Sequence, residues 1–478
     1  MPSISALTYW KIGIAILLVG IASSLLTAQS GPFYLGADLS YTNEMQDCEA
    51  SYFAQGVEVD PYALFAERGS NLVRLRLWHT PSWYETISDK GTYSNLADVK
   101  WSISRAFDQG MEVLLDFHLS DTWADPGNQI MPLAWEPVAD DLELLEDSLY
   151  NYIYSTLESL NEEGLLPQMV QIGNETNKGI LLTKEKNDEG WSLDWNRNAQ
   201  LFNEAIRAVK TFESDNNVEI KTVIHCAGPE NAEWLFGSFI DNGVTDFDIM
   251  GLSYYWQWNQ PLTNTGTADV IKKLKEDHPA YEVLIVETGY VWTQNSKDNA
   301  NNVLGATHPD FSPASPENQK AWLIDLTEKT IEAGGMGVIY WEPTWVSTSC
   351  NTLWARGSHY ENAVFFDFSN DLLENGGIGW LSHKYDINTT STKSNVFDQY
   401  LIVYNSTDEQ SIIIEWNHPE EKLEEVRLMN LQGQLLSQNK IYGEQEKLTL
   451  PEIGTGIYIL SFTGTFGGVI SKKVYLTP

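Results

Sequence analysis

The sequence predicts an α/β protein built as a (β/α)8 (TIM) barrel and followed by a small C-terminal all-β, sandwich-like domain. Eight apolar runs of strand length occur between residues 33 and 343, and stretches with helical spacing separate them. The composition changes after Trp380. Repeated strand and helix alternation is typical of a parallel sheet, and eight repeats predict that the sheet closes into a barrel.

The predicted barrel strands are residues 33–39, 72–78, 112–118, 169–175, 221–227, 248–255, 283–289 and 337–343. Amphipathic helices are predicted in the intervals at 142–163, 198–213 and 316–334, where Gly334 and Gly335 supply a stop. Six strands end in polar or aromatic residues. Functional residues of such barrels lie at the carboxyl ends of the strands, so we expect the site there.

The C-terminal part divides into a linker and a second domain. Residues 386–395 include the polar run Asn388 to Asn395, and residues 396–478 contain alternating segments at 412–416, 425–431, 447–450, 456–463 and 469–476. Such alternation predicts short strands. We expect residues 29–385 to form the catalytic domain and 396–478 to form a β-sandwich without a catalytic site of its own.

The N-terminus has the pattern of an export signal. Lys11 precedes an apolar run over residues 12–22, and Ala28 is a plausible last residue before cleavage. We therefore expect a signal peptide over residues 1–28 and a secreted or cell-surface protein. A permanent anchor is the alternative, although the run is shorter than the roughly 20 residues that a membrane span requires.

The charge balance restricts the partners. The chain has 478 residues with 29 Lys and Arg against 66 Asp and Glu, a net charge of −37. This charge repels nucleic acid, anionic membranes and polyanionic polysaccharides. A neutral partner is expected, and nucleic acid is not.

Three cysteines are too few for a disulfide framework and lack the spacing of metal ligands. Cys48 follows the first predicted barrel strand and Cys350 follows the last. Closure of the barrel makes these two loops neighbours, so a Cys48–Cys350 disulfide is possible. Cys226 is expected to be a buried thiol.

Two glutamates, Glu175 and Glu287, stand at the ends of predicted barrel strands. A retaining glycosidase needs two carboxyl groups about 5–5.5 Å apart, one as nucleophile and one as proton donor. We assign Glu287 as nucleophile, because Arg74 or Arg76 and a tyrosine of residues 248–255 can keep it charged. Glu175 is then the acid/base. Either glutamate alone could equally be a surface carboxylate.

Further residues at the strand ends are candidates for sugar binding. Asn174 can bind the 2-hydroxyl group, and a neutral His118 beside Ser120 and Asp121 can bind a hydroxyl or support the arginine. The alternative is a core histidine. We expect Trp341 to form the floor of the subsite at the cleaved bond. The alternative is a buried residue, because any single tryptophan more often packs in the core than serves as a platform for a sugar ring. The other aromatic candidates along the cleft are Trp78, Trp123, Trp256, Trp258, Trp292 and Trp345. The predicted substrate-binding set is Arg74, Arg76, His118, Asp121, Trp123, Asn174, Tyr254, Tyr255, Trp256, Trp292 and Trp341.

Several motifs together resemble a known family. They are GADLS at 36–40, RLRLW at 74–78, DFHLSDTWADP at 116–126, IGNE at 172–175, GLSYY at 251–255, VET at 286–288 and YWEP at 340–343. This set is similar to family 53 glycoside hydrolases, the endo-β-1,4-galactanases of clan A, over residues from about 33 to about 380. The resemblance implies Glu175 as acid/base, Glu287 as nucleophile and a neutral galactan of pectin side chains as substrate. It implies no essential organic cofactor, and we expect a monomer.

The chain also departs from its relatives. Residues 176–183 lack a tryptophan that relatives often carry near Leu182, and Trp256 stands where proline is common. These loops line distal subsites, so product length and the choice between endo and exo cleavage stay open. Some bacterial relatives bind calcium between the last two barrel loops. Asp298, Asn299, Asn301 and Asn302 supply oxygen atoms there, and a solvated loop is the alternative.

The tail from about residue 396 resembles the sorting domain of type IX secretion cargo. The resemblance rests on residues 450–458 and on Lys472, Lys473 and Val474. It implies the secretion machinery as a partner, and a carbohydrate-binding module is the alternative. For the barrel, the alternatives are another clan A β-glycanase, such as a mannanase or glucanase, and a non-catalytic glycan-binding barrel.

Overall fold

The computed structural model describes residues 32–189, 193–385, 401–405, 411–416, 422–430, 435–443, 445–449, 456–464 and 469–476. The predicted signal peptide (1–28) and linker (386–395) lie outside the described residues. Within the described ranges, no helix combines the length and apolar character needed to cross a membrane.

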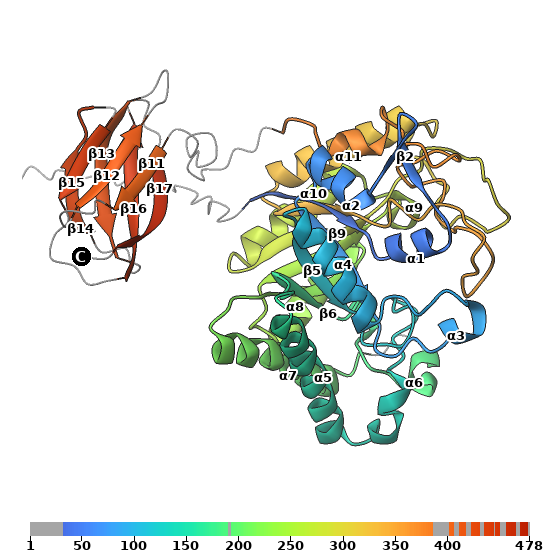
Figure 1. Ribbon diagram of the computed structural model, residues 1–478. Coiled ribbons are helices and arrows are strands. Elements are labelled where there is room, and N and C mark those ends of the chain that lie inside the picture. The colour runs from blue at the N-terminus through green and yellow to red at the C-terminus, as the bar shows by residue number, and fades with distance from the viewer. Residues whose placement is uncertain are drawn as a thin grey trace, which may run out of the picture.

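The main domain is the predicted barrel (Figure 1). Its strands close in the order β1-β10-β9-β8-β7-β6-β5-β4, and every neighbouring pair is parallel. The strands are β1 Tyr34–Asp38, β4 Leu72–Leu77, β5 Glu112–Phe117, β6 Met169–Ile172, β7 Lys221–Ala227, β8 Ile249–Tyr254, β9 Glu282–Thr288 and β10 Gly337–Tyr340. All eight predicted strands are confirmed.

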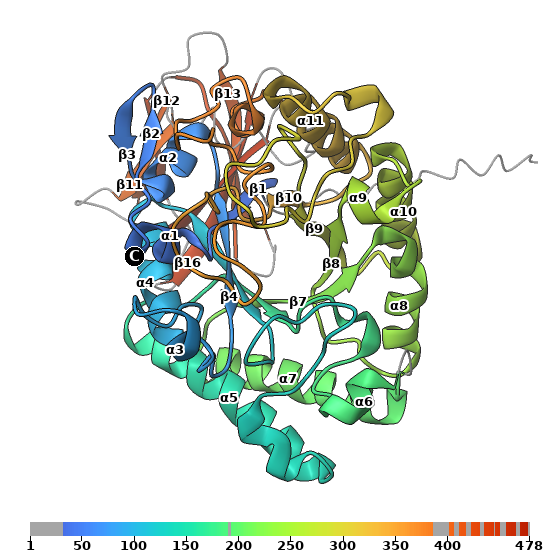
Figure 2. The same cartoon turned by 90° about the vertical axis from the view of Figure 1, so that its right-hand side faces the viewer.

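Helices surround this ring of strands (Figure 2). The longer ones are α2 Pro61–Arg68, α4 Leu96–Asp108, α5 Leu142–Glu162, α7 Trp195–Asn216, α8 Pro229–Asp241, α10 Asn264–Asp277 and α11 Pro316–Glu332. The shorter ones are α1 Thr42–Asp47, α3 Tyr84–Ile87, α6 Lys184–Asp188 and α9 Trp256–Asn259. Polar side chains cap the N-termini of helices. The Asp141 side chain accepts a hydrogen bond from the Leu144 amide, and the Ser315 side chain accepts one from the Asn318 amide. The three predicted helices are confirmed as α5, α7 and α11.

The barrel interior changes from apolar to polar along the strands. Its apolar layer includes Leu72, Leu114, Met169 and Val223, all buried. Alternate residues of a strand share a face, so the next inward positions on these strands are Arg74, Asp116, Gln171 and His225. These four polar side chains are also buried. A charged layer therefore lies at the carboxyl end of the barrel.

The first crossover begins with α1 and a two-stranded hairpin, β2 Tyr52–Ala54 and β3 Val57–Val59. Cys48, which follows α1, forms a disulfide with Cys350 in the long segment after β10, with 5.9 Å between the Cα atoms. The predicted disulfide is confirmed. Cys226 is free and buried, also as predicted.

The C-terminal domain consists of two antiparallel sheets, in the order β11-β12-β15 and β14-β13-β16-β17. The strands are β11 Leu401–Asn405, β12 Ser411–Trp416, β13 Leu423–Met429, β14 Leu435–Lys440, β15 Gln445–Thr449, β16 Gly456–Gly464 and β17 Val469–Leu476. One apolar core joins the sheets, with Ile412 and Ile414 from the first and Leu428 and Phe462 from the second. The all-β prediction is confirmed, although it missed β11 and β14.

Candidate active site

A bulge in β9 turns Glu287 into the barrel. Leu252 of β8 pairs with Ile285 and the next residue, Ser253, pairs with Glu287, so Val286 has no partner on β8. Val286 joins Leu284 in the interior apolar layer. In an unbroken strand Glu287 would then face outward, because neighbouring residues alternate. The extra residue restores the inward direction, as bulges beside active sites often do.

Glu175 lies in a turn and not in a strand. β6 ends at Ile172, and both Gly173 (φ 74°) and Glu175 (φ 48°) have left-handed backbone conformations. A Cβ atom at Gly173 would lie 2.6 Å from Thr176 Cγ2, so only glycine fits there. The Glu175 amide donates a hydrogen bond to His225 Nδ1 at 3.2 Å, which anchors the turn on β7.

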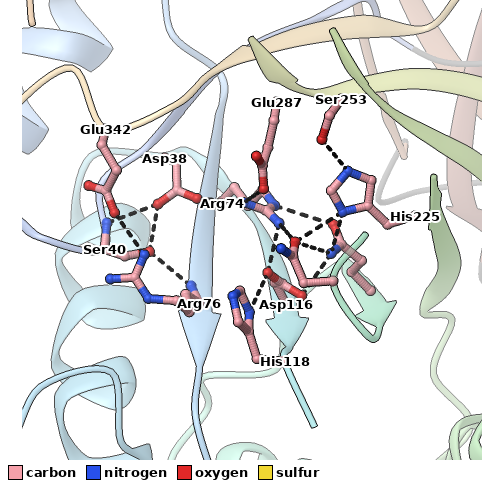
Figure 3. A network of polar contacts seen from close by, with 12 residues as sticks. Asp38, Ser40, Arg74, Arg76, Asp116, His118, His225, Ser253, Glu287 and Glu342 are labelled. Atoms are coloured by element: carbon pink, nitrogen blue, oxygen red, sulfur yellow. Dashed lines mark hydrogen bonds and ion pairs between the residues drawn. The ribbon is translucent and has the colours of Figure 1, made fainter. Parts of the chain in front are cut away.

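Arg74 is the centre of the charged layer (Figure 3). Its Nη1 atom lies 2.8 Å from Asp38 Oδ2 and 2.9 Å from Glu287 Oε1, and its Nη2 atom lies 2.7 Å from Asp116 Oδ2. Nη2 also donates to Asn174 Oδ1 at 2.7 Å. One guanidinium thus orients the residue next to Glu175 and contacts Glu287 directly.

The two glutamates differ in their surroundings. Glu287 receives the Arg74 ion pair and a hydrogen bond from the Tyr255 hydroxyl at 3.1 Å. Burial raises the pKa of Glu287 to about 7, against the lowering effects of Arg74 and Tyr255. Burial and the nearby Glu287 charge raise the pKa of Glu175 to about 8. The Glu287 charge is among the causes that raise the pKa of Glu175, so a proton shared by the pair favours Glu175.

Arg76 lies beside Arg74 in the interior but does not contact Glu287. It pairs with Glu342 Oε1 at 3.0 Å, and the rings of Tyr41, Trp78 and Trp123 surround its guanidinium at 4.8, 4.6 and 4.2 Å. The suggestion that either arginine could support Glu287 is thus resolved in favour of Arg74. Arg76 is buried, and its visible role is to hold Trp123 in place by cation–π contact.

His118 is buried next to the charged layer, with Nδ1 2.9 Å from Asp116 Oδ2. Burial lowers its pKa, so the ring is neutral. Asp116 in turn pairs with Arg74. This contact chain agrees with the prediction that a neutral His118 supports the arginine, while hydroxyl binding stays a prediction.

Two predicted sugar-binding residues have other partners. Tyr254 is wrong as a site residue: its hydroxyl donates to Leu262 O at 2.9 Å and its ring stacks on Trp322 of α11, outside the barrel. Strand alternation explains this, since Ser253 and Tyr255 face inward. The Asp121 carboxylate accepts hydrogen bonds from the backbone amides of Thr80 and Leu133, each at 2.9 Å. It thereby connects the loops that contain these residues.

Partly exposed or exposed aromatic side chains form two groups in the loops after the barrel strands. Trp123 and Trp341 are partly exposed, with ring centroids 6.0 Å apart, and Trp354 continues this group 6.3 Å from Trp123. Trp354 is 60% exposed and was not predicted. Trp258 of α9 is 56% exposed and lies 4.8 Å from Tyr255.

Other predicted platform residues are buried or turned away. Trp78 and Trp345 are buried in the core, which contradicts a platform role for them. Trp256 is nearly buried and packs edge-on against His308, and Trp292 donates its indole N–H to Glu361 O at 3.1 Å. For the last two residues no contact with the two glutamates is visible in the structure.

Two of the predicted calcium ligands, Asp298 and Asn301, have partners within the chain. Asp298 Oδ1 accepts the Ala300 amide at 2.7 Å and Oδ2 accepts the Ser358 amide at 2.8 Å, so its carboxylate joins the segments that follow β9 and β10. The Asn301 carbonyl contacts His359 Nδ1 at 2.9 Å. Across the part of the chain that the structure describes, no group of three or more His, Cys, Asp or Glu is arranged to hold a metal ion. Because that search does not cover the amide oxygens of Asn299 and Asn301, calcium binding stays a prediction.

Five further side chains complete the polar network, and none of them was predicted to be functional. They are His225, Ser253, Glu342, Asp38 and Gln171. A signal existed for His225, because a histidine at an inward position of the apolar run 221–227 needs buried polar partners. The same argument applies to Gln171 of β6.

Comparison with known proteins agrees with this geometry. The family model described as glycosyl hydrolase family 53 matches residues 34–375. An arabinogalactan endo-β-1,4-galactanase of Cellvibrio japonicus is 48% identical over 74% of this chain and 91% of its own length. An endo-β-1,4-galactanase of Bacillus subtilis is 32% identical over 73% of this chain and 76% of its own length.

Solved structures show the same relationship. The family 53 catalytic domain of Ignisphaera aggregans has a TM-score of 0.64 at 29% identity and covers 75% of this chain and 98% of that domain. A fungal β-1,4-galactanase structure has a TM-score of 0.62 at 26% identity and covers 74% of this chain and all of its own. The chain is a glycoside hydrolase that belongs to glycosyl hydrolase family 53.

Proposed function

We propose that this protein cleaves internal β-1,4-galactosidic bonds of galactan and arabinogalactan side chains of pectin, with retention of anomeric configuration. The observation that carries the proposal is the asymmetry of the carboxyl pair. Arg74 and Tyr255 stabilise negative charge on Glu287, and the pKa of Glu175 is raised further than that of Glu287. A double-displacement mechanism requires one ionised and one protonated carboxyl group.

In the first step, the Glu287 carboxylate attacks the anomeric carbon and forms an ester bond as the glycosidic C–O bond breaks. Glu175 gives its proton to the leaving oxygen. Asn174, whose Oδ1 accepts from Arg74 and whose Nδ2 donates to Ala124 O at 2.8 Å, is held in a fixed orientation next to Glu175. We assign it to the 2-hydroxyl group of the reacting sugar.

In the second step, the ionised Glu175 takes a proton from a water molecule. The water oxygen attacks the anomeric carbon, and the ester bond to Glu287 breaks. Two inversions at the same carbon give net retention. The two glutamates and one water molecule supply every group that reacts in these two steps.

The substrate assignment rests on the relatives and on the aromatic surface. Both curated relatives described above bear endo-β-1,4-galactanase names. Trp123, Trp341 and Trp354 lie in loops after β5 and β10, whereas Trp258 lies after β8. Exposed indoles at separate parts of the rim suit a chain that extends beyond the reacting sugar, as endo cleavage requires. A net charge of −37 favours neutral galactan over an acidic backbone.

We further propose export by residues 1–28, a C-terminal domain that serves the type IX secretion machinery, and action as a monomer outside the cytoplasm. These proposals rest on sequence patterns, and a carbohydrate-binding role is the alternative for the C-terminal domain. Calcium is not part of the proposed mechanism.

The decisive assay uses the purified protein on linear β-1,4-galactan, with mannan and cellulose in parallel. The proposal expects reducing ends from galactan alone, oligomers of several lengths at early times, and products that appear first as the β-anomer by NMR. Equal release from mannan or cellulose would favour another clan A glycanase. Calorimetric binding of galactan without any released reducing ends would favour a non-catalytic barrel.

A further inference from the structure

Glu342 is a buried glutamate two residues after β10, and the proposed mechanism does not use it. Its backbone is left-handed (φ 46°), a conformation that residues other than glycine seldom adopt. Its Oε1 atom accepts from Arg76 Nη1 at 3.0 Å (Figure 3), and its Oε2 atom accepts from the Tyr41 amide at 3.0 Å. Burial and the nearby Asp38 raise the pKa of Glu342, whereas Arg76 and the Tyr41 amide lower it. Strained backbone persists where surrounding contacts hold it, and such positions cluster at functional sites.

Arg76 connects this carboxyl group to the aromatic surface. Its Nη1 atom contacts Glu342, whereas Nε and Nη2 have no hydrogen-bond partner among the described residues. The Trp78 and Trp123 rings lie 4.6 and 4.2 Å from its Cζ atom. Cation–π contacts thus take the place of hydrogen bonds on that side of the guanidinium. The position of the Trp123 ring therefore depends on where Glu342 holds Arg76.

The same glutamate determines the course of the chain at Trp341. Trp341 directly precedes Glu342, and its partly exposed ring lies 6.0 Å from that of Trp123. The Tyr41 amide holds Glu342 from the loop after β1, and the Tyr41 ring stacks on Trp345 at 4.1 Å. Trp123 and Trp341 are therefore held by one buried carboxyl group, the first through Arg76 and the second through the backbone.

We propose that Glu342 and Arg76 are positioning residues that set the spacing and tilt of Trp123 and Trp341 for stacking on a neutral sugar ring. This inference rests on the proposed galactanase function and deepens it. An indole binds the apolar face of a sugar over a flat area, so a displaced ring loses much of that contact. Among the described residues, Glu342 and Arg76 form no hydrogen bond or ion pair with Glu175 or Glu287. The pair therefore acts on glycan binding and not on proton transfer.

The first test replaces Arg76 by lysine in the full-length enzyme. Lysine keeps a positive charge for Glu342 but lacks the flat guanidinium group that the rings contact. We expect KM for galactan to rise roughly tenfold and kcat to change by less than about threefold, because stacking is lost in the ground state and the transition state alike. Both limbs of the pH profile should stay in place.

Arg105→Lys is the matched control. Arg105 also combines a carboxylate partner with a ring, since it lies 2.6 Å from Asp60 and 4.3 Å from the Tyr62 centroid. It belongs to α4, outside the barrel, so its replacement should leave KM at the wild-type value.

A second variant allows for misfolding of the first, because disturbing one partner of a buried ion pair leaves the other charge uncompensated. Arg76→Met/Glu342→Gln removes both charges at similar volume and keeps an oxygen atom for the Tyr41 amide. Thermal unfolding should show a cooperative transition for this variant. Its KM for galactan should also rise roughly tenfold, because the Trp123 ring has lost the cation that it contacts.

A double-mutant cycle separates positioning from a general loss of structure. Trp123→Ala alone should raise KM roughly tenfold, and Arg76→Lys/Trp123→Ala should raise it no further, because the ring that Arg76 positions is already absent. Independent effects would multiply to about 100-fold. Multiplied effects, a folded Arg76 variant with the wild-type KM, or a shifted pH limb would overturn the positioning role. Absence of galactan cleavage by the wild-type enzyme would instead refute the proposed function, and the same cycle would then be read from calorimetric binding of galactan fragments.

Discussion

The Arg74 guanidinium lies 2.9 Å from the Glu287 carboxylate across the barrel interior, although β1 and β10 separate β4 from β9 in the closed sheet. Asp38 and Asp116 share the same guanidinium at 2.8 and 2.7 Å. The barrel thus places one buried cation among three carboxylates, and the proposed nucleophile, Glu287, is the most exposed of the three.

Arg74→Lys should reduce kcat/KM on galactan by roughly 100-fold or more. A lysine keeps the positive charge but lacks the planar guanidinium group, whose N–H groups can contact several carboxylates at once. The acid limb should also move to higher pH, since Arg74 lowers the pKa of Glu287. Arg68→Lys is the matched control, because Arg68 pairs with Glu374 at the surface. Similar kinetics for both variants would contradict the role of Arg74.

The pH dependence of kcat/KM should be bell-shaped, with both limbs above the ordinary glutamate range. Activity rises as Glu287 ionises, with a pKa near 7, and falls as Glu175 loses its proton, with a pKa near 8. Initial rates at low substrate concentration across pH 4 to 10 measure both limbs. An acid limb near pH 4.5 would show that burial does not act on Glu287 as described.

Trp354→Ala should raise KM for long galactan roughly tenfold and leave hydrolysis of a short aryl galactoside unchanged, because the lost stacking lies away from the reacting sugar. Trp101→Ala is the matched control: Trp101 is 61% exposed, against 60% for Trp354, but belongs to α4 on the outside of the barrel. An equal rise in KM for both variants would remove Trp354 from the cleft.

Replacement of Cys48 and Cys350 by alanine should lower the unfolding free energy of the barrel by about 2–4 kcal/mol, because the bond closes a very long loop. The two cysteines are 302 positions apart in sequence. Thermal unfolding of the double variant, and of the wild type under reducing conditions, measures this effect. An unchanged melting temperature in both would argue against the disulfide.

The strands were predictable because each is an apolar run whose inward and outward faces are both buried in a barrel. The β9 bulge was not predictable, because a regular alternation from Leu284 and Val286 would have placed Glu287 on the outer face. Glu287 was found because it lies near the end of the strand and in a motif of the family that the chain resembles. Glu175 was expected in a strand, yet the chain leaves β6 three residues earlier and adopts a left-handed turn.

The errors in the site have local causes. Tyr254 and Tyr255 are adjacent and chemically identical, and strand alternation from Ser253 would have separated them. Trp354 belongs to the irregular region after β10, where no periodicity indicates which side chains face the cleft. The buried tryptophans Trp78 and Trp345 differ from the exposed ones only in their tertiary contacts. Sequence pattern therefore located the rim of the barrel better than the individual side chains on it.

The most direct test of the glutamate assignments is azide rescue on an activated β-galactoside. Glu175→Ala still forms the ester with Glu287, so azide should replace water and give the β-galactosyl azide. Glu287→Ala leaves a space on the opposite face, so azide should give the α-galactosyl azide. NMR of the two products distinguishes these outcomes. The same anomer from both variants, or full galactanase activity in either one, would contradict a shared groove with Glu287 as nucleophile and Glu175 as acid/base.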